Sequence, residues 1–449
     1  MTNWQADMTS RTKQNSSKSY FAAGAIMVAA MVVRAAWVLY CARAGSLFVG
    51  GDPFQIGEIG AIARNLAEHR GFSFPFGIGS DPTGWECPIV PFIYAAAIKL
   101  AGGATIHAAT LIVYLQVIAG GIGAGLYWLN VRHLVDRNPG GFAGWLSPAI
   151  AAGVCLWPES VFSVTQLWYF VWQEVALALF LLLAMRWTEK PGRRSAALAG
   201  ISGGVLALIN VTPIPIVLIT IALVAAKTRF NRDSLRSPAI ALLCFLAVIA
   251  PWLTRNALVF HALVPLRSNA GYEIFQGNNA IECIREPYDA PHPANHKREF
   301  QLYMQMGELQ YCRYSFHRAV VYISAHPLQT VWRIGDRIYV TWLTDLTDRW
   351  VPYDVTPWWQ RSVRFRMRFL FSAMLVIAAT AAFLLGVIRG RFALLPHAHI
   401  IAAILILLPF PHYFTLADTE YTTTFRMLVA ITALCMMALR AEKRDTARA

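Results

Sequence analysis

The chain has 449 residues, of which 56% are hydrophobic and only 14% are charged, and its mean hydropathy is +0.45. A soluble domain carries about a quarter charged residues, so this composition excludes an ordinary water-soluble globular protein. The net charge of +14 does not indicate nucleic-acid binding, because the basic residues form short clusters between apolar segments, as the positive-inside rule requires of membrane proteins.

Apolar segments near spanning length recur along the chain and predict about ten transmembrane helices, although several fall short of the ~20 residues of a full span. The polar stretch 1–19 is predicted to be a cytoplasmic tail and not a cleavable signal, since the apolar run after it is long enough to span. The predicted segments lie at about 20–42, 105–130, 142–157, 166–185, 196–212, 214–226, 238–254, 368–388, 394–412 and 424–439.

The basic clusters also predict the orientation. If the N-terminus is cytoplasmic, every short basic cluster lies in the cytoplasm, so both termini are expected inside the inner (plasma) membrane and two larger segments outside it. The predicted parts are an N-terminal tail, a transmembrane module containing a first external loop, an external loop domain, C-terminal transmembrane helices and a final tail. They cover residues 1–19, 20–254 with the loop at 43–104, 255–367, 368–440 and 441–449.

The first external loop, 43–104, carries the clearest chemical signals. Asp52-Pro53 has the residue types of a helix start, and apolar residues follow at helical spacing until Gly71 ends the pattern. This helix is too polar to span and is predicted to lie in the membrane interface. A second short apolar helix is expected near 88–100.

Carboxylates in this loop are candidates for a general base that acts on a substrate emerging from lipid. The alternative for Asp52 is a helix cap, and for Glu58 it is the polar face of the interfacial helix. The candidates are Asp52, Glu58, Asp81 and Glu86.

Two charged residues fall inside predicted spans. Arg34 and Glu174 each lie about 12 Å below the external end of their helix, at the rise of an α-helix. Charges within a membrane are paired or functional, so the two side chains are predicted to face each other or to share one polar cavity. A structural pair is the favoured interpretation, and contact of Arg34 with a substrate phosphate is the alternative.

His292 and His296 have the spacing of metal ligands but lie in a Pro-rich segment without a carboxylate pattern. A solvated loop is therefore expected rather than a zinc site, and no metal ligand is assigned.

Several blocks of the chain resemble, in order, the GT-C superfamily of lipid-linked sugar transferases. The nearest likeness is to the bacterial branch described as dolichyl-phosphate-mannose-protein mannosyltransferase-like, which is related to the aminoarabinose transferase of lipid A. The first block contains IARNLAEHRGFSFPF and DPTGWECPIVPFIYAAAIKLAGG, and the most specific one is PWLTRNALVFHALVPLRSNAGYEIFQGNN. The blocks lie at 51–103, 156–158, 203–213, 251–279 and 326–342.

The resemblance implies an all-α polytopic membrane protein: a GT-C-type bundle of about ten helices, with interfacial helices in the first external loop and a small external loop domain. It also implies an inverting glycosyltransferase that moves a sugar from a polyprenyl-phosphate donor to an envelope lipid, glycan or protein on the periplasmic face. Some members use a divalent metal and others do not, so no cofactor is assigned.

The resemblance assigns roles to residues in the matched blocks, and the buried charges Arg34 and Glu174 add two candidates that the sequence indicates without it. Asp52 or Glu58 is the expected base, because the family places an acidic residue before the Ile-Ala of the first loop helix. Asp52 lies a turn further away than the common pattern, while Glu58 fits a branch that uses Glu close to that Ile-Ala. The expected donor-phosphate ligands are Arg255, Arg267 and Arg34, and the expected substrate contacts are Glu273, Asn278, Glu86 and Glu174.

Two departures keep other functions open. Asp52 is displaced from the usual family position, and the family's Arg-Tyr-Arg near the last helix is reduced here to Glu420-Tyr421 and Arg426. One alternative is a polytopic transporter or lipid flippase, which an inverted repeat would favour. The other is a non-catalytic relative that binds polyprenyl phosphate.

Overall fold

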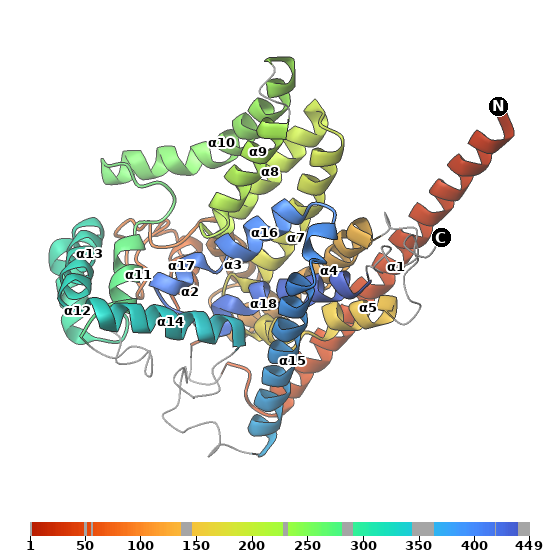
Figure 1. Cartoon of the computed structure of the whole chain (residues 1–449). Helices are drawn as coiled ribbons and strands as arrows, with labels where there is room; N and C mark the ends of the chain where they lie inside the picture. Colours follow the sequence, from red (N-terminus) through yellow and green to blue (C-terminus); the bar gives the residue numbers. More distant parts are fainter. Residues whose placement is uncertain are drawn as a thin grey trace.

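The computed structural model describes residues 2–48, 52–54, 57–135, 146–227, 232–280, 291–343, 363–417 and 419–438. In these residues the regular secondary structure is entirely helical, apart from one isolated bridge between Ser73 and Pro82 (Figure 1). The expected all-α fold class is therefore confirmed for the part of the chain that is described.

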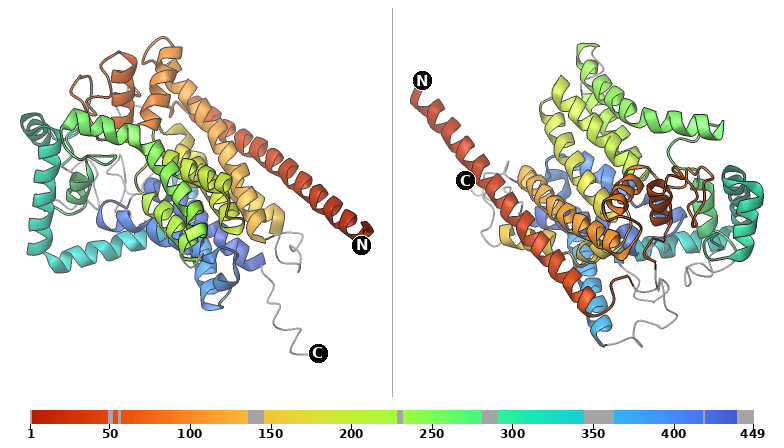
Figure 2. Two further views of the ribbon diagram at one scale, coloured as in Figure 1. Left: turned by 90° about the horizontal axis from the view of Figure 1, so that it is seen from above. Right: turned by 180° about the vertical axis from the view of Figure 1, so that it is seen from behind.

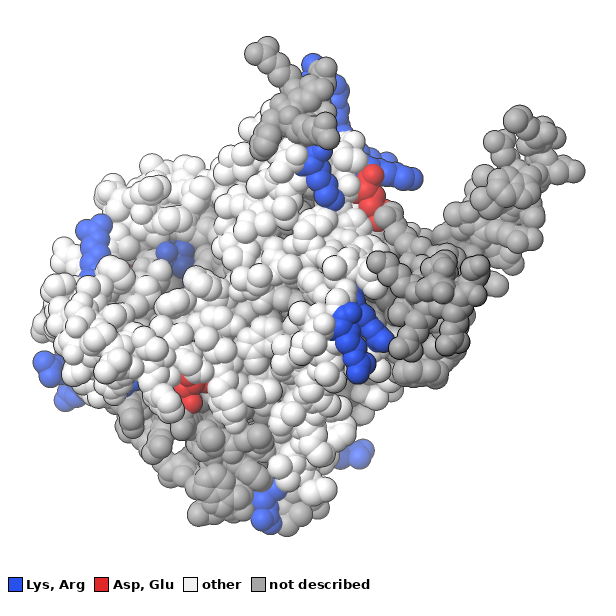
Figure 3. All heavy atoms as spheres, viewed as in Figure 1, with Lys and Arg blue, Asp and Glu red and all other residues white. Residues whose placement is uncertain are grey.

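Among the described residues, five helices are long and apolar enough to cross a membrane, through the parts Tyr20–Arg43, Ile106–Leu134, Phe170–Glu189, Leu235–Phe260 and Phe369–Ile388. This composition suits a multi-pass protein in a lipid bilayer. Uncharged side chains cover most of the described surface in Figure 3, with scattered lysines and arginines. The five spans belong to α1 (Thr2–Arg43), α4 (Ile106–Val135), α7 (Phe170–Glu189), α10 (Arg232–Phe260) and α15 (Val363–Ile388).

Helices that are not among these five occupy the other predicted segments, so the expected count of about ten spans stays a prediction. The break between α8 and α9 covers residues 210–213 and ends with Pro213, which cannot donate a backbone hydrogen bond. These helices are α5 (Leu146–Leu156), α6 (Pro158–Phe162), α8 (Arg193–Ile209), α9 (Ile214–Lys227), α16 (Ala398–Leu407), α17 (Phe410–Phe414) and α18 (Thr419–Ala438).

Helices α1 and α4 pack side by side (Figure 2). Gly121 of α4 faces Met31, and Gly125, one turn further along α4, faces Met27, one turn back along α1. The helices are therefore antiparallel. A Cβ atom added at Gly121 would lie 2.3 Å from Met31 Cγ, so small residues permit this close approach. The start of α4 thus lies at the same end of the bundle as the end of α1.

The loop between these two helices contains α2 (Glu58–Ala67) and α3 (Ile89–Leu100). The expected helix near 88–100 is confirmed, but the expected helix start at Asp52-Pro53 is wrong, because the described helix begins at Glu58. The Asp52 carboxylate instead accepts a hydrogen bond from the backbone N–H of Phe54 at 2.9 Å. This is the local turn chemistry of aspartate, which competes with helix capping.

The second external segment forms α11 (Ala270–Gly277), α12 (Lys297–Met306), α13 (Glu308–Ala325) and α14 (Pro327–Leu343). Helices α11 to α13 share an aromatic core with the first loop. Two segments far apart in the sequence therefore fold against each other. The buried members of this core are Phe74, Trp85, Tyr272, Phe275, Tyr303, Tyr311, Cys312 and Ala319.

Glu308, at the first turn of α13, joins the two segments. Its carboxylate accepts hydrogen bonds from the hydroxyl of Thr83, from the backbone N–H of Gly84 at 2.7 Å, and from Ser268 Oγ at 2.6 Å. Tyr303 donates a fourth bond at 3.1 Å. The side chain is buried, so the four donors replace the water that this carboxylate would otherwise need.

Replacing Glu308 with Ala should leave these four donors without an acceptor. Hydrogen bonds to a charged group contribute about 1.5–3 kcal/mol each and are not additive, so we expect destabilisation of about 4 kcal/mol. The measurement is the apparent melting temperature in detergent, together with the rate of proteolysis within residues 71–88.

Glu68→Ala is the matched control, because Glu68 is a solvent-accessible carboxylate that pairs with Arg64 and Arg70 at the surface. Equal melting temperatures and equal proteolysis rates for the two variants would contradict the role given to Glu308.

Candidate functional site

Three carboxylates surround one arginine where the first loop meets the second external segment. Glu58 is the first residue of α2, and Glu86 lies two residues before the N-cap of α3. Arg267 lies between α10 and α11, and Glu273 lies in the first turn of α11. The shared aromatic core brings these distant parts of the sequence together. Four of the site residues expected from the sequence therefore form one cluster.

Arg267 is the centre of this cluster. Its Nη2 donates to Glu86 Oε1 at 2.8 Å, and its Nε donates to the backbone carbonyl of Trp85, also at 2.8 Å. Glu273 Oε1 lies 3.7 Å from the same Nη2. The side chain of Glu86 is only 3% exposed and that of Arg267 13%, so this contact is shielded from solvent.

Glu58 has a different partner. Its Oε1 lies 2.9 Å from His292 Nε2, and both side chains are 13% exposed. The ring of His292 is surrounded by Phe76, Trp85 and Tyr272, whose centroids lie 5.5, 6.4 and 5.4 Å from it. The expectation of a solvated loop is therefore wrong at His292, because this aromatic enclosure draws the imidazole inward against Glu58.

The environments of Glu58 and Glu86 push their protonation in opposite directions. Burial raises the pKa of Glu86 to about 8, and the nearby carboxylates of Glu58 and Glu273 add to this effect against the charge of Arg267. Burial alone would also raise the pKa of Glu58, but the hydrogen bond and charge of His292 hold it below its usual value. At neutral pH one carboxyl is therefore protonated and the other ionised, a pairing typical of acid–base sites.

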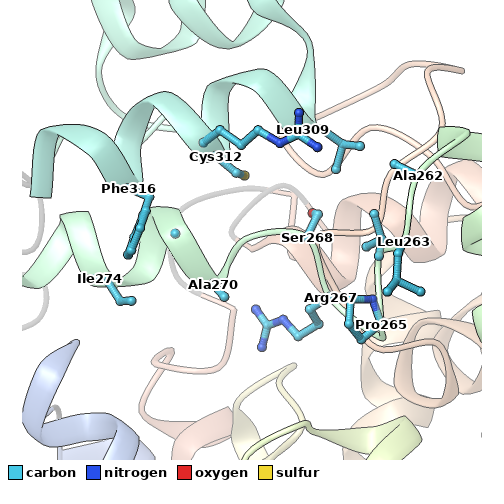
Figure 4. A pocket seen from close by; sticks show the side chains of 13 residues that line it. Ala262, Leu263, Pro265, Arg267, Ser268, Ala270, Ile274, Leu309, Cys312 and Phe316 are labelled. Carbon is cyan, nitrogen blue, oxygen red and sulfur yellow. The ribbon is translucent and has the colours of Figure 1, made fainter. Parts of the chain in front are cut away.

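A cavity of about 410 Å³ adjoins Arg267 on the side of α11 and α13 (Figure 4). Apolar side chains make up most of its wall, and Arg267, Ser268 and Arg313 are its polar members. The apolar lining residues include Leu263, Pro265, Ile274, Leu309 and Phe316. Arg267 thus contacts both an apolar cavity and the carboxylate cluster.

Arg255 lies outside this cluster, near the end of α10. Its Nη1 donates to the carbonyl of Thr83 at 2.7 Å, and its Nη2 donates to the carbonyl of Phe72 at 2.9 Å. The guanidinium also lies 4.8 Å from the ring of Trp252. These contacts fix the first loop onto α10, and a phosphate-binding role for Arg255 stays a prediction.

Two other expected residues also lie apart from the cluster. Asp52 Oδ2 lies 2.6 Å from Arg64 Nη1, so its carboxylate already has a cationic partner on α2. Asn278 donates to the carbonyls of Ile274 and Phe414, at 2.8 Å in each case. It thereby connects the end of α11 to α17, and its role as a substrate contact is untested.

Arg34 and Glu174 share one polar site inside the helix bundle, as the sequence predicts. Arg34 Nη2 donates to Ser160 Oγ at 2.7 Å, and Ser160 Oγ lies 2.8 and 2.9 Å from the two oxygens of Glu174. Arg34 also donates to the carbonyl of Cys155 at 3.3 Å. The serine hydroxyl between the two charges supports the interpretation as a structural pair.

Sequence reasoning missed three contributors to this region and its support. His292 carries no spacing signal that points to Glu58, and Glu308 lies on an ordinary amphipathic helix. The third is the ion pair between Arg426 and Glu159, with Nη1 and Oε1 2.5 Å apart. The contacts of Glu308 and Arg426 join residues more than 200 positions apart in the sequence, and the contact of His292 depends on the fold of the loop. No local sequence pattern could therefore reveal these contacts.

The raised pKa of Glu86 predicts a pH dependence of stability. Between pH 4.5 and about 8 the folded protein holds a proton at Glu86 that the unfolded chain releases, so stability should fall as pH rises through this window. This pH-dependent decrease in the free energy of unfolding is on the order of 3 kcal/mol, and Glu86→Gln should abolish it. The measurement is the apparent melting temperature of both proteins from pH 5 to 8, and parallel pH curves would contradict the assignment.

Removing one member of the intramembrane pair should cost more than removing both. Arg34→Met leaves the Glu174 carboxylate without its cation, which destabilises buried pairs by about 3–5 kcal/mol. The double variant Arg34→Met with Glu174→Met should recover most of this loss. Melting temperatures of the single and double variants in detergent measure the coupling, and additive effects would show that the two side chains act independently.

No protein-family model, no curated protein and no solved structure matches this chain at a significant level.

Proposed function

We propose that this protein is an integral-membrane glycosyltransferase that moves a sugar from a polyprenyl-phosphate donor to an envelope acceptor on the external face. The observation that carries the proposal is the arrangement around Arg267. An ionised Glu58 and a protonated Glu86 lie on one side of it, and an apolar cavity lies on the other. A lipid-linked phosphate needs both an apolar enclosure and a cation.

Glu58 is the proposed base. In the transfer step the acceptor hydroxyl gives its proton to the Glu58 carboxylate while its oxygen forms a bond to the anomeric carbon of the sugar. The bond from that carbon to the phosphate oxygen breaks, and the electron pair leaves with polyprenyl phosphate. The hydrogen bond from His292 orients the carboxylate, as the supporting partner does in other acid–base sites.

Arg267 is the proposed phosphate ligand. Its forked guanidinium suits phosphate oxygens, and the negative charge on the leaving phosphate grows in the transition state. Because Glu86 is neutral below pH 8 or so, it does not cancel the charge of Arg267. The same protonated carboxyl can donate a hydrogen bond to a phosphate oxygen.

The cavity next to Arg267 suits the isoprenoid part of the donor. Leu263 on its wall is 88% exposed and Phe316 is 46% exposed, so the apolar surface continues outward from the cavity. Such exposed apolar surface beside a polar site marks a place where a lipid or another apolar ligand binds.

Between the two candidate bases, the geometry favours Glu58 over Asp52. Asp52 is bound to Arg64 and to a backbone N–H in its own turn, which explains its position without a catalytic role. Glu58 lies in the cluster that contains Arg267, and it has a partner that keeps it ionised. No described feature specifically favours the transporter, the flippase or the non-catalytic relative.

The test is sugar transfer in membranes that contain radiolabelled polyprenyl-phosphate sugars, with label followed into lipid, glycan and protein fractions. Glu58→Gln should lower the transfer rate by about 10²–10⁴-fold, the usual contribution of a general base. Asp52→Asn is the matched control and should retain most of the wild-type rate. Arg267→Lys should also lower transfer, since lysine lacks the fork of donors.

The outcomes separate the proposal from its alternatives. Transfer that survives Glu58→Gln but not Asp52→Asn would move the base to Asp52. Donor binding without transfer from any sugar would indicate the non-catalytic relative. Movement of labelled lipid across the bilayer without transfer would indicate a flippase.

A further inference from the structure

A second cluster of ligand-type side chains lies at the other end of the bundle. His133 is near the end of α4, roughly 40 Å along that helix from its start in the first loop, at 1.5 Å per residue. Glu189 is the last residue of α7, and His397 is the N-cap of α16. Among the described residues this is the one group of three such side chains with metal-binding spacing.

Both imidazoles point at the same oxygen atom. Glu189 Oε1 lies 2.7 Å from His133 Nε2 and 2.9 Å from His397 Nε2. The ligand atoms all lie within 4.8 Å of one another. The two rings are stacked, with centroids 5.8 Å apart and planes 14° from parallel. The three side chains are between 6% and 21% exposed, so they are held mainly by protein.

The hydroxyl of Thr188 lies between the Met185 carbonyl and the ring of His397. Thr188 Oγ1 donates its proton to the carbonyl of Met185 at 2.8 Å and lies 2.9 Å from His397 Nδ1. With this proton on the Met185 carbonyl, the oxygen acts as the acceptor and Nδ1 carries a hydrogen. In a neutral imidazole this leaves a lone pair on Nε2, directed at the carboxylate oxygen of Glu189. A lone pair facing a carboxylate requires a cation between them or a proton on the ring.

We propose that His133, Glu189 and His397 bind a divalent transition-metal ion of the zinc class. Two imidazole nitrogens and one carboxylate oxygen form a familiar zinc ligand set, which leaves the fourth position for water. The hydrogen bond from His397 Nδ1 to Thr188 is the outer-shell contact that fixes the tautomer of a metal-binding histidine. The proposal is independent of the transferase function.

The present distances need only a small adjustment to admit the ion. Zinc bonds of about 2.0–2.1 Å in a tetrahedral arrangement place neighbouring ligand atoms roughly 3.4 Å apart. The nitrogens of His133 and His397 would have to withdraw from Glu189 Oε1 by about half an ångström, which is within the reach of side-chain rotation.

Such an ion would connect distant parts of the chain. Glu189 and His397 are 208 residues apart, and α16 belongs to the C-terminal helices whereas α4 and α7 belong to the N-terminal bundle. A bond between these parts closes a long loop. The ion therefore joins two parts of the bundle and lies far from Arg267.

The experiment uses the full-length protein in detergent, purified with a tag that contains no histidine and stripped with a chelator. Zinc is added, unbound metal is removed, and bound metal is measured by mass spectrometry. Cobalt(II) is added to a second sample to record its ligand-field absorption. We expect one zinc per chain, a tetrahedral cobalt spectrum and a melting temperature about 5 °C higher with zinc.

Three variants test the ligands. His133→Gln and His397→Gln should lose the stoichiometric zinc and the cobalt spectrum, whereas His107→Gln, at an exposed position near the start of α4, should bind as wild type does. Thr188→Val retains all three ligands but removes the outer-shell acceptor, so it should weaken zinc binding by about 10–100-fold.

Thr188→Val keeps the test informative if the histidine variants do not fold. Zinc binding equal in Thr188→Val and wild type would overturn the proposal, as would substoichiometric zinc in the wild type. If the chelator leaves the melting temperature unchanged and only acid raises it, a proton and not a metal ion lies between the histidines and Glu189.

Discussion

Arg267 is held in a position where water is largely excluded, and the contacts of its guanidinium determine the character of the external site. It donates to Glu86 and to the backbone of Trp85, with Glu273 nearby. A guanidinium stays charged in proteins, whereas a buried carboxyl can take up a proton. Burial raises the pKa of Glu86 against the charge of Arg267, so Glu86 is protonated at neutral pH, while Glu58 stays ionised against His292. Opposed protonation states within one site follow from the burial of Glu86 and from the partner that Glu58 has in His292.

The frame around Arg267 is held by two other charged side chains that are fully engaged. Glu308 gathers donors from both external segments, and Arg255 binds carbonyls of the first loop from the end of α10. Neither group has solvent as its main partner. Together they fix the loop between α1 and α4 relative to the bundle, so the carboxylates on that loop meet residues that follow more than 180 positions later. Preorganisation of this kind is what electrostatic catalysis requires.

The sequence predicts the elements of the fold better than their limits or their contacts. Apolar periodicity locates the helices, and the two buried charges Arg34 and Glu174 can be paired from their depth alone, because the membrane leaves them few partners. The sequence predicts that α2 begins at Asp52, but it begins at Glu58. The prediction is wrong because an aspartate side chain can accept a hydrogen bond within a turn as well as cap a helix. The site is only partly predictable: Glu58, Glu86, Arg267 and Glu273 are identifiable as polar residues in external segments, but their meeting depends on a shared aromatic core, and His292 has no sequence signal.

The central claim is that Arg267 receives the phosphate of a lipid-linked sugar, with the lipid in the adjoining cavity. The most direct measurement is photo-crosslinking of the full-length protein with a polyprenyl phosphate that carries a photoreactive group in its first isoprene unit. Labelled peptides are then identified by mass spectrometry. The account predicts labels within 262–274 and 309–316, competed by unlabelled polyprenyl phosphate and lost in Arg267→Ala. Labels confined to α14 and α18, near the buried Arg333 and Arg426, and unchanged in Arg267→Ala, would contradict it.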